Sequence, residues 1–326
     1  MKFDFKNLLK LLISLLLGGF IIWYIQKDLS DSDKNQIITS IRNVDLIYVF
    51  AIAVLGILAC IIRGYRWKML LKPLGYEPNV LILICSIFIM YIANLLFPRL
   101  GEVTRCTILQ KQEKIPFEKS FGTMIVERLV DMIGMGIIAL LGVFLEYDKF
   151  LTLFSNLFKN SQNKKEESSL LVPIIIVFLI IIGTFAFWKN PKIKNFILEK
   201  IKGIIDGLTS IFKLENPILF IIYSASIYGI YFISTYILYF AIQGTSHLTF
   251  TSTFVTLSAA TLGVGLTQGG IGAFQFLVTK TLELYNVTTS IGLAYAWTSW
   301  LIQTANLVIF GILSWIYILI RPDGKR

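Results

Sequence analysis

The sequence has little of what metal sites and disulfide frameworks need. It contains one histidine, His247, and three cysteines, Cys60, Cys85 and Cys106, which share no C-x-x-C spacing. Metal sites and disulfide frameworks are recognised from clustered or regularly spaced residues of these two types. We therefore expect no metal, no cofactor and no disulfide framework.

Charged residues are also scarce. They make up 15% of the 326 residues, against 56% hydrophobic residues, whereas the apolar share of a soluble globular domain is roughly 45–50%. This balance predicts an all-α integral membrane protein. The net charge of +10 does not indicate nucleic acid, because the lysines and arginines lie in short segments between apolar runs, as in cytoplasmic loops of membrane proteins.

A helix that crosses a bilayer needs about 20 apolar residues. Candidate runs occur at 8–25, 44–62, 79–97, 121–145, 170–188, 217–242, 251–285 and 291–320. Two of them are interrupted: the run at 79–97 leads into Pro98 and Gly101, and the run at 251–285 contains a glycine-rich stretch. We expect Gly101 to permit a tight turn there.

The distribution of basic residues indicates how these two runs lie. Cytoplasmic segments are rich in lysine and arginine, which places the N-terminus, with Lys2, Lys6 and Lys10, in the cytoplasm. A complete crossing by 79–97 would put the next basic residues outside, whereas a hairpin at 79–110 that enters and returns keeps them inside. That hairpin puts the polar loop 146–169 outside, and a second hairpin at 251–285, entering from the outer side, leaves the C-terminal tail inside. The basic residues that this topology keeps on the cytoplasmic side are Arg99, Arg105, Lys111, Lys114, Lys119, Arg321, Lys325 and Arg326.

The prediction is one membrane domain over 1–326, with six transmembrane helices, two oppositely oriented re-entrant hairpins and both termini cytoplasmic. The hairpins fall inside two repeats, 44–145 and 217–320, the second inverted relative to the first. Inverted repeats with broken helices at corresponding places point to a transporter-like site near mid-membrane. Eight plain spans remain the alternative, since charge bias has exceptions.

Charged residues inside the first repeat are the main site candidates. They are Asn94, Arg99, Glu102 and Arg105 beside the first interruption, and Glu127, Arg128 and Asp131 in the following span. A charged side chain at mid-bilayer costs roughly 2.5–3.5 kcal/mol, so these groups must pair or contact water. Arginines in a polar cavity can hold a phosphate or carboxylate, and we expect Glu127 and Asp131 to anchor arginines. The alternative is a salt-bridge network that only locks the hairpin to the helix.

Two further groups are weaker candidates. Arg63 and Arg66 lie at the cytoplasmic end of the second helix, where we expect them to snorkel to headgroups; a contribution to the mouth of the cavity is the alternative. In the second repeat Gly269, Gly270 and Gly272, with Gln275, could turn backbone N–H groups toward an anion. Close packing of small residues is the alternative for the glycines.

The set Asn94, Pro98, Arg99, Gly101, Glu102 and Arg105, followed by "ERLVD" at 127–131 and a late Gly-Gly-x-Gly, resembles the lysylphosphatidylglycerol synthase transmembrane family, also called flippase-like or UPF0104 membrane proteins. The resemblance covers the chain from about "RGYRWKMLL" onward. It implies the membrane half of the multiple peptide resistance factor, which moves aminoacylated phosphatidylglycerol between leaflets. No soluble transferase domain is expected within these residues. The chain departs from the family pattern at Thr267, often proline, and at Gln275, commonly acidic.

The function we expect is a lipid translocase of the bacterial cytoplasmic (inner) membrane, not an enzyme. Its partner would be a membrane lipid: an anionic or aminoacylated phospholipid, or a polyprenyl phosphate. One alternative is an accessory subunit for a separate lipid-modifying transferase, which a stoichiometric partner would reveal. Another is an intramembrane lipid-phosphate enzyme with Glu102, Glu127 or Asp131 as base; detection of a hydrolysed or covalent lipid product would favour it.

Overall fold

A computed structural model describes residues 19–24, 27, 29–97, 99–149, 152 and 205–321, and every regular element within these residues is helical. Four helices are long: α3 (Leu46–Leu71), α6 (Phe117–Leu145), α10 (Pro217–Ala241) and α13 (Thr289–Ile320). Five are shorter: α2 (Asp31–Arg42), α4 (Val80–Leu96), α5 (Leu100–Glu113), α11 (Ser252–Leu266) and α12 (Ala273–Glu283). Single 3-10 turns are η1 (Lys72–Leu74), η2 (Ser210–Lys213) and η3 (Gln268–Gly270).

The four long helices are the candidate membrane spans of the described chain. Each is long and apolar enough to cross a bilayer: an 18-residue window has a mean hydropathy of 2.6 within Leu46–Leu74 and of 1.7 to 2.0 within the other three. Their outward surfaces carry large apolar side chains, among them Met132 and Phe144 on α6 and Leu319 on α13, exposed by 71%, 86% and 69%. Apolar side chains exposed on this scale fit a lipid environment. The protein is an all-helical, multi-pass membrane protein.

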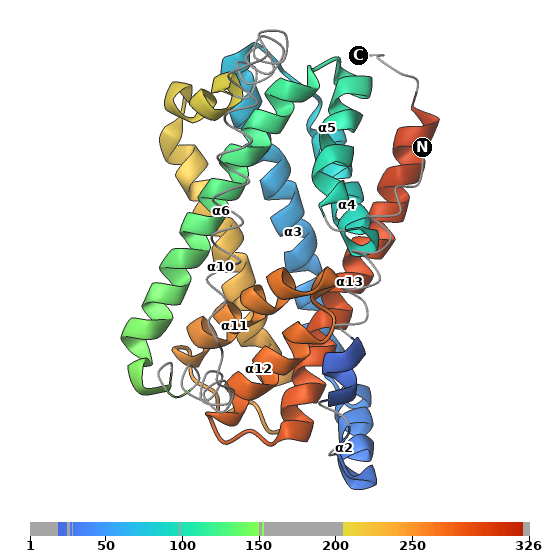
Figure 1. Ribbon diagram of the computed structural model, residues 1–326, viewed down its shortest axis with the longest axis vertical. Helices are drawn as coiled ribbons and strands as arrows, with labels where there is room; N and C mark the ends of the chain where they lie inside the picture. The colour runs from blue at the N-terminus through green and yellow to red at the C-terminus, as the bar shows by residue number, and fades with distance from the viewer. Residues whose placement is uncertain are drawn as a thin grey trace, which may run out of the picture.

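Four of the shorter helices form two antiparallel pairs, α4–α5 and α11–α12, and the first helix of each pair is apolar. The longest of the four, α4, has 17 residues and rises about 25 Å, less than the hydrocarbon core of about 30 Å. In Figure 1 the α4–α5 pair occupies the upper part of the molecule and the α11–α12 pair the lower part, both among the long helices. Each of these four helices is thus shorter than the thickness of the hydrocarbon core.

The two pairs meet at their turns. The side-chain amide of Gln268, in η3, donates a hydrogen bond to the backbone carbonyl of Asn94 in α4. Gly269 lies against Leu95, because a Cβ at Gly269 would come within 2.9 Å of the Leu95 Cδ2. The indole Nε1 of Trp300, in α13, donates to the Gly269 carbonyl at 2.8 Å. The turn of the second pair is thus held between α4 and α13.

Two apolar cores lie at opposite ends of the helix bundle. The upper core gathers around Trp67, Leu70 and Leu71 at the end of α3, and the lower core around Tyr239 and Tyr295 of α10 and α13. Each core joins one short-helix pair to the long helices, through Leu109 of α5 above and through Phe274 and Val278 of α12 below. The charged residues of the first repeat lie next to the upper core, because the Trp67 ring of that core stacks against the guanidinium of Arg105.

Several sequence predictions fall outside the described residues. They include most of the first helix at 8–25, of which 19–24 are helical, the whole span 170–188, nearly all of the loop 146–169, and the terminal basic residues Lys2, Lys6, Lys10, Lys325 and Arg326. The apolar run at 44–62 lies within α3, which extends beyond it to Leu71 and includes Arg63 and Arg66. The two arginines of this extra stretch form buried ion pairs, which keep the segment helical and packed.

Candidate functional site

Two carboxylates on α6 organise the candidate site. Glu127 and Asp131 lie one helical turn apart and point to the same side of α6, as their four-residue spacing predicts. The Glu127 side chain is fully buried and that of Asp131 is 15% exposed. No other residue of α6 between Phe121 and Leu145 carries a charge except Arg128. The two carboxylates therefore need cationic partners from neighbouring helices.

Arg63 and Arg66 of α3 supply two of these partners. Arg63 Nη1 donates to Glu127 Oε1 at 3.0 Å and to Asp131 Oδ2 at 2.6 Å. Arg66 Nη2 donates to Glu127 Oε1 at 3.2 Å and to Asp131 Oδ1 at 2.7 Å. Each guanidinium thus bridges both carboxylates through a single terminal nitrogen, and its other terminal nitrogen is left to contact α10. The expectation that these two arginines snorkel to headgroups was wrong, since their side chains are 4% and 0% exposed.

Arg105 of α5 is the third buried partner. Its Nη2 lies 2.6 Å from Glu127 Oε2, and its guanidinium carbon lies 3.4 Å from the centroid of the Trp67 ring. The Trp67 Nε1 donates in turn to the Thr123 hydroxyl at 3.0 Å. A guanidinium stacked on tryptophan is a favourable cation–π contact. Glu127 therefore accepts from three arginines, which come from α3 and from the first short-helix pair.

Helix α10 contributes hydroxyl groups to the same site. Tyr228 donates to Asp131 Oδ1 at 3.0 Å, Arg63 Nη2 donates to the Tyr231 hydroxyl at 3.3 Å, and Arg66 Nη1 donates to the Ser224 hydroxyl at 3.3 Å. Tyr228 and Tyr231 thus touch the charged groups. Two other tyrosines of α10 have different partners: Tyr239 donates to Thr256, and Tyr236 packs against aromatic rings.

One edge of the site is partly open. Arg128 is 35% and Glu102 20% exposed, and Arg128 Nη2 lies 3.5 Å from Glu102 Oε1. Arg128 Nη1 also lies 4.0 Å from Asp131 Oδ2. Glu102 pairs with Arg128, whereas Arg105, three residues further along α5, turns to Glu127.

We call the seven ionised groups the charge network: Arg63, Arg66, Arg105, Arg128, Glu102, Glu127 and Asp131. It holds four arginines and three carboxylates, so one positive charge is in excess. The Nε atom of each of the four arginines is buried and has no hydrogen-bond partner among the described residues, and the same holds for Glu102 Oε2. Such buried unsatisfied donors call for an explanation.

Arg99 and Asn94 lie at the turn between α4 and α5. Arg99 has a left-handed backbone (φ 61) and an exposed side chain, and no ion pair joins it to a described residue. Asn94 Oδ1 accepts from the Gly101 N–H at 2.8 Å, and its Nδ2 donates to Glu102 Oε1 at 3.3 Å. Asn94 thus closes the turn and orients a member of the charge network.

Gly101 acts differently from the tight-turn role expected for it. It lies inside α5, and a Cβ there would come within 2.1 Å of the Met90 carbonyl oxygen and 2.8 Å of the Asn94 side chain. The left-handed residue of this turn is Arg99. Gly101 is therefore needed for the close approach of α5 to α4, and the close approach brings Arg105 to Glu127.

The turn of the second pair has no charge. Gly269, Gly270 and Gly272 all have positive φ angles. The Gly272 N–H, a predicted anion donor, donates to Gln275 Oε1 at 2.8 Å, so the Gln275 side chain occupies it and caps α12. Gln275 Nε2 is buried without a partner among the described residues. The structure brings this turn to Asn94 but shows no contact between these four residues and the charge network.

One known protein family matches most of the chain. The family described as "Lysylphosphatidylglycerol synthase TM region" matches residues 7–311. The chain belongs to this family. The resemblance seen in the residues at 94–105 and 127–131 is thus confirmed.

Several curated proteins are similar to this family member. The UPF0104 membrane protein MJ1078 of Methanocaldococcus jannaschii is 27% identical over 68% of the chain and 92% of its own length. MJ1595 of the same organism is 33% identical over 39% of the chain and 36% of its length. The glycosyltransferase AglD of Haloferax volcanii is 30% identical over 34% of the chain and 18% of its length. No solved structure matches the chain.

Residues missed by the sequence analysis complete the site. Trp67, Thr123 and Ser224 hold or contact the arginines, and none carries a signal that separates it from ordinary packing. The prediction that Glu127 and Asp131 anchor arginines is confirmed. Among the described residues no cluster of histidine, cysteine or acidic side chains is arranged to hold a metal ion.

Proposed function

We propose that the protein is a lipid translocase whose charge network binds the phosphate of a membrane lipid. The observation that carries the proposal is the excess arginine in a network that lies among apolar helices, where the partly exposed Arg128 has an Nε donor with no partner among the described residues. An unbalanced cation is expensive in this setting. A phosphate group supplies both the charge and the acceptor oxygens that guanidinium groups bind best.

Buried residues of the network hold the site in shape, whereas exposed arginines can contact the lipid. Arg105 and Glu127 are fully buried and paired, so they fix the geometry of the site. Arg128, at 35% exposure, and Arg99, exposed at the hairpin turn, are the arginines that a phosphate can reach. We infer that the lipid phosphate binds between these two, while the acyl chains stay in the surrounding hydrocarbon.

The topology we propose has two re-entrant hairpins, α4–α5 and α11–α12, which enter from opposite faces. Helix, hairpin and helix then recur as α3, α4–α5, α6 and as α10, α11–α12, α13, in the repeats 44–145 and 217–320. Two further spans, at 8–25 and 170–188, complete six crossings with both termini in the cytoplasm of a bacterial cell. Inverted repeats that rock against each other expose a central site to each leaflet in turn, which is the motion a translocase needs. The contact between Gln268 and Asn94 would loosen in that motion.

A second candidate is an accessory role beside a lipid-modifying transferase. One observation favours it: part of this chain is similar to a segment that makes up 18% of a protein named a glycosyltransferase. In that case the same phosphate site would hold the lipid for a separate protein. The chain itself is assigned no chemical step in either proposal.

Lipid exchange in proteoliposomes tests the first proposal. Labelled phosphatidylglycerol, its lysylated form and a polyprenyl phosphate are reconstituted with the protein, and the fraction accessible from outside is followed over time. We expect exchange of at least one lipid, slowed about tenfold or more by Arg128→Gln, since a hydrogen bond to a charged group contributes about 1.5–3 kcal/mol. Arg42→Gln, in α2 and outside the network, is the matched control. Absence of exchange for every lipid, or equal rates in Arg128→Gln and wild type, would refute the proposal.

A further inference from the structure

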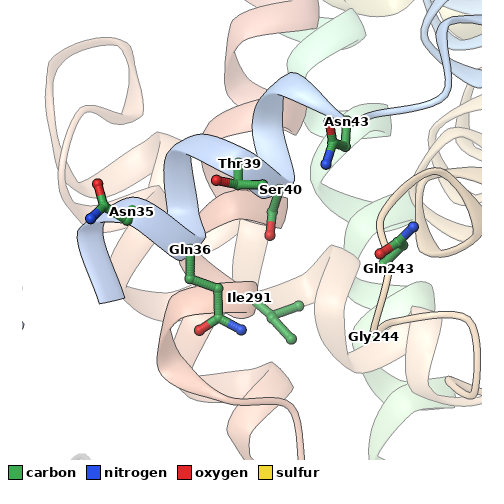
Figure 2. Close-up of a pocket in the computed structure, with 8 residues that line it drawn as sticks. All are labelled: Asn35, Gln36, Thr39, Ser40, Asn43, Gln243, Gly244 and Ile291. Carbon is green, nitrogen blue, oxygen red and sulfur yellow. The ribbon is translucent and has the colours of Figure 1, made fainter. Parts of the chain in front are cut away.

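A pocket of about 460 Å³ lies between α2, the turn after α10 and the start of α13. Figure 2 shows the side chains of α2 on one side and Gln243, Gly244 and Ile291 on the other. The polar side chains that line it are Asn35, Gln36, Thr39, Ser40, Asn43 and Gln243. All six are uncharged carboxamides or hydroxyls. The charge network is remote, because α3 carries Arg63 about 25 Å along its axis from Leu46.

The pocket lining contains no charged residue, although α2 itself carries several. Helix α2 contains four charged residues, Asp31, Asp33, Lys34 and Arg42, and none of them lines the pocket. At about 100° per residue, the four lining residues within α2 share an arc of roughly 140°. The helix therefore presents a neutral polar face to the pocket, with Asp33 and Arg42 just outside the two edges of that face.

The lining groups have free hydrogen-bonding capacity. None of the six polar side chains forms a side-chain hydrogen bond with another residue of the described chain. Carboxamides and hydroxyls both donate and accept. An ion would meet no opposite charge in this pocket, and an apolar ligand would leave these groups without partners, at a cost for each. A neutral ligand with many hydroxyls matches both properties.

The α2 wall of the pocket is fixed at both ends. At its start Ser30 and Asp33 form a capping box, and Asp33 Oδ1 accepts from the Ser290 hydroxyl of α13 at 2.9 Å. Beyond its end the Asp45 N–H donates to the Ala241 carbonyl of α10 at 3.3 Å. A wall held in this way loses little freedom when a ligand binds.

The opposite wall is fixed as well. Gly244 has a φ of +93, and a Cβ there would come within 2.7 Å of the Ile291 Cδ1. The buried Thr245 hydroxyl lies 2.7 Å from the Tyr239 carbonyl oxygen and 2.9 Å from that of Ile242. The turn that carries Gln243 is thus shaped before any ligand arrives.

We propose that this pocket binds an uncharged, hydroxyl-rich group of the glycosyl class. The binding itself does not depend on lipid translocation. Its place in a lipid path, as a second subsite for the headgroup of a phosphate-bearing glycolipid, rests on the function proposed above. In the proposed topology the pocket faces the extracytoplasmic side, opposite the end where the α4–α5 pair enters.

Binding to the full chain in nanodiscs tests the pocket. The probes are monoglucosyl diacylglycerol, diacylglycerol without the sugar, and free methyl glucoside, and retention is measured by native mass spectrometry and titration. We expect the glucosyl probe to bind in preference to diacylglycerol. Gln36→Leu and Gln243→Leu, on different walls, each remove one or two hydrogen bonds and should weaken it by about threefold to tenfold. Lys34→Gln, on α2 outside the pocket, should bind as wild type does.

The three probes distinguish the possible ligands of the pocket. Binding of the glycolipid alone supports a lipid-linked sugar, and equal binding of methyl glucoside supports a soluble sugar as the ligand. No glucosyl binding by wild type, or unchanged binding by both leucine variants, overturns the proposal. Arg128→Gln should leave glucosyl binding intact, so loss of lipid exchange with binding retained assigns the failure to the proposed function and not to the pocket.

Discussion

Arg105 Nη2 lies 2.6 Å from Glu127 Oε2, and neither side chain is exposed. This pair joins the first hairpin to α6, while Glu127 also accepts from Arg63 and Arg66. Glu127 is therefore the one carboxylate among the described residues that contacts all three buried arginines, and removal of its charge leaves them facing each other with only Asp131 between.

Glu127→Gln should destabilise the protein strongly. Removal of one partner from a buried ion pair costs about 3–5 kcal/mol, and here one substitution weakens three pairs. The free energy of unfolding, measured by denaturant titration in detergent, should fall by at least that amount. Asp31→Asn is the control: its ion pair with Lys34 is 94% exposed on the aspartate side, so the substitution should change little. A Glu127→Gln protein as stable as Asp31→Asn would contradict the role assigned to Glu127.

Gly101→Ala should separate α5 from α4. The added Cβ would lie 2.1 Å from the Met90 carbonyl oxygen, and backbone atoms cannot move aside as a side chain can. The expected loss is at least about 1–3 kcal/mol, as for overpacked cores, with weaker lipid exchange. Gly136→Ala in α6, where a Cβ meets nothing within 4 Å, should be neutral or stabilising by up to about 1 kcal/mol. Equal unfolding free energies for the two variants would show that the hairpin packs differently.

Two substitutions at Arg99 separate the effect of its backbone strain from the effect of its side-chain charge. Its left-handed backbone (φ 61) costs a non-glycine residue roughly 1–2 kcal/mol. Arg99→Gly should therefore raise the unfolding free energy and Arg99→Ala should leave it nearly unchanged, while both slow lipid exchange through loss of the guanidinium. Thermal unfolding and exchange rates are measured on the same preparations. If either variant exchanged lipid as fast as wild type, Arg99 would have no part in phosphate binding.

The sequence alone was sufficient to predict which residues share a face of one helix and where helices are interrupted. The four-residue spacing of Glu127 and Asp131 placed both on one face of α6, and their pairing with arginines followed from the cost of burying charge. Pro98 and the glycines at 263–272 marked the two places where the described helices are short and paired. These features are local, so the sequence carries them directly.

Contacts between helices could not be read in the same way. Nothing in the spacing of Arg63 and Arg66 indicates which helix they face, and arginines at the end of an apolar run are equally suited to headgroups. Gly101 offered the same ambiguity, because glycine serves both left-handed turns and close helix packing. The network became visible only when α3, α5 and α6 were placed together in space.

The attachment of α2 to α13 should depend on pH. Hydrogen bonds from the Ser30 hydroxyl, the Ser290 hydroxyl and the Ser30 backbone N–H lower the pKa of Asp33. Because the folded-state pKa lies below that of the unfolded chain, the stabilisation is present above the ordinary value of about 4 and is lost as the pH falls through the lowered pKa. Hydrogen exchange of α2, corrected for intrinsic rates, should increase below about pH 4. Asp33→Asn should remove this pH dependence and Asp31→Asn should preserve it; persistence in Asp33→Asn would assign it to another group.

Accessibility labelling decides the topology. Helices α5 and α2 lie toward opposite ends of the molecule (Figure 1); Lys111, near the end of α5, and Ser32, in α2, are both exposed. In a background where the buried Cys60, Cys85 and Cys106 are replaced, Lys111→Cys should react in inside-out vesicles only and Ser32→Cys in intact cells only. A re-entrant α4–α5 pair returns Lys111 to the cytoplasmic face because each of its helices rises less than the 30 Å or so of the hydrocarbon core. Labelling of Lys111→Cys from outside would mean that α4 crosses completely, and the inverted repeat, with the path proposed between its halves, would have to be abandoned.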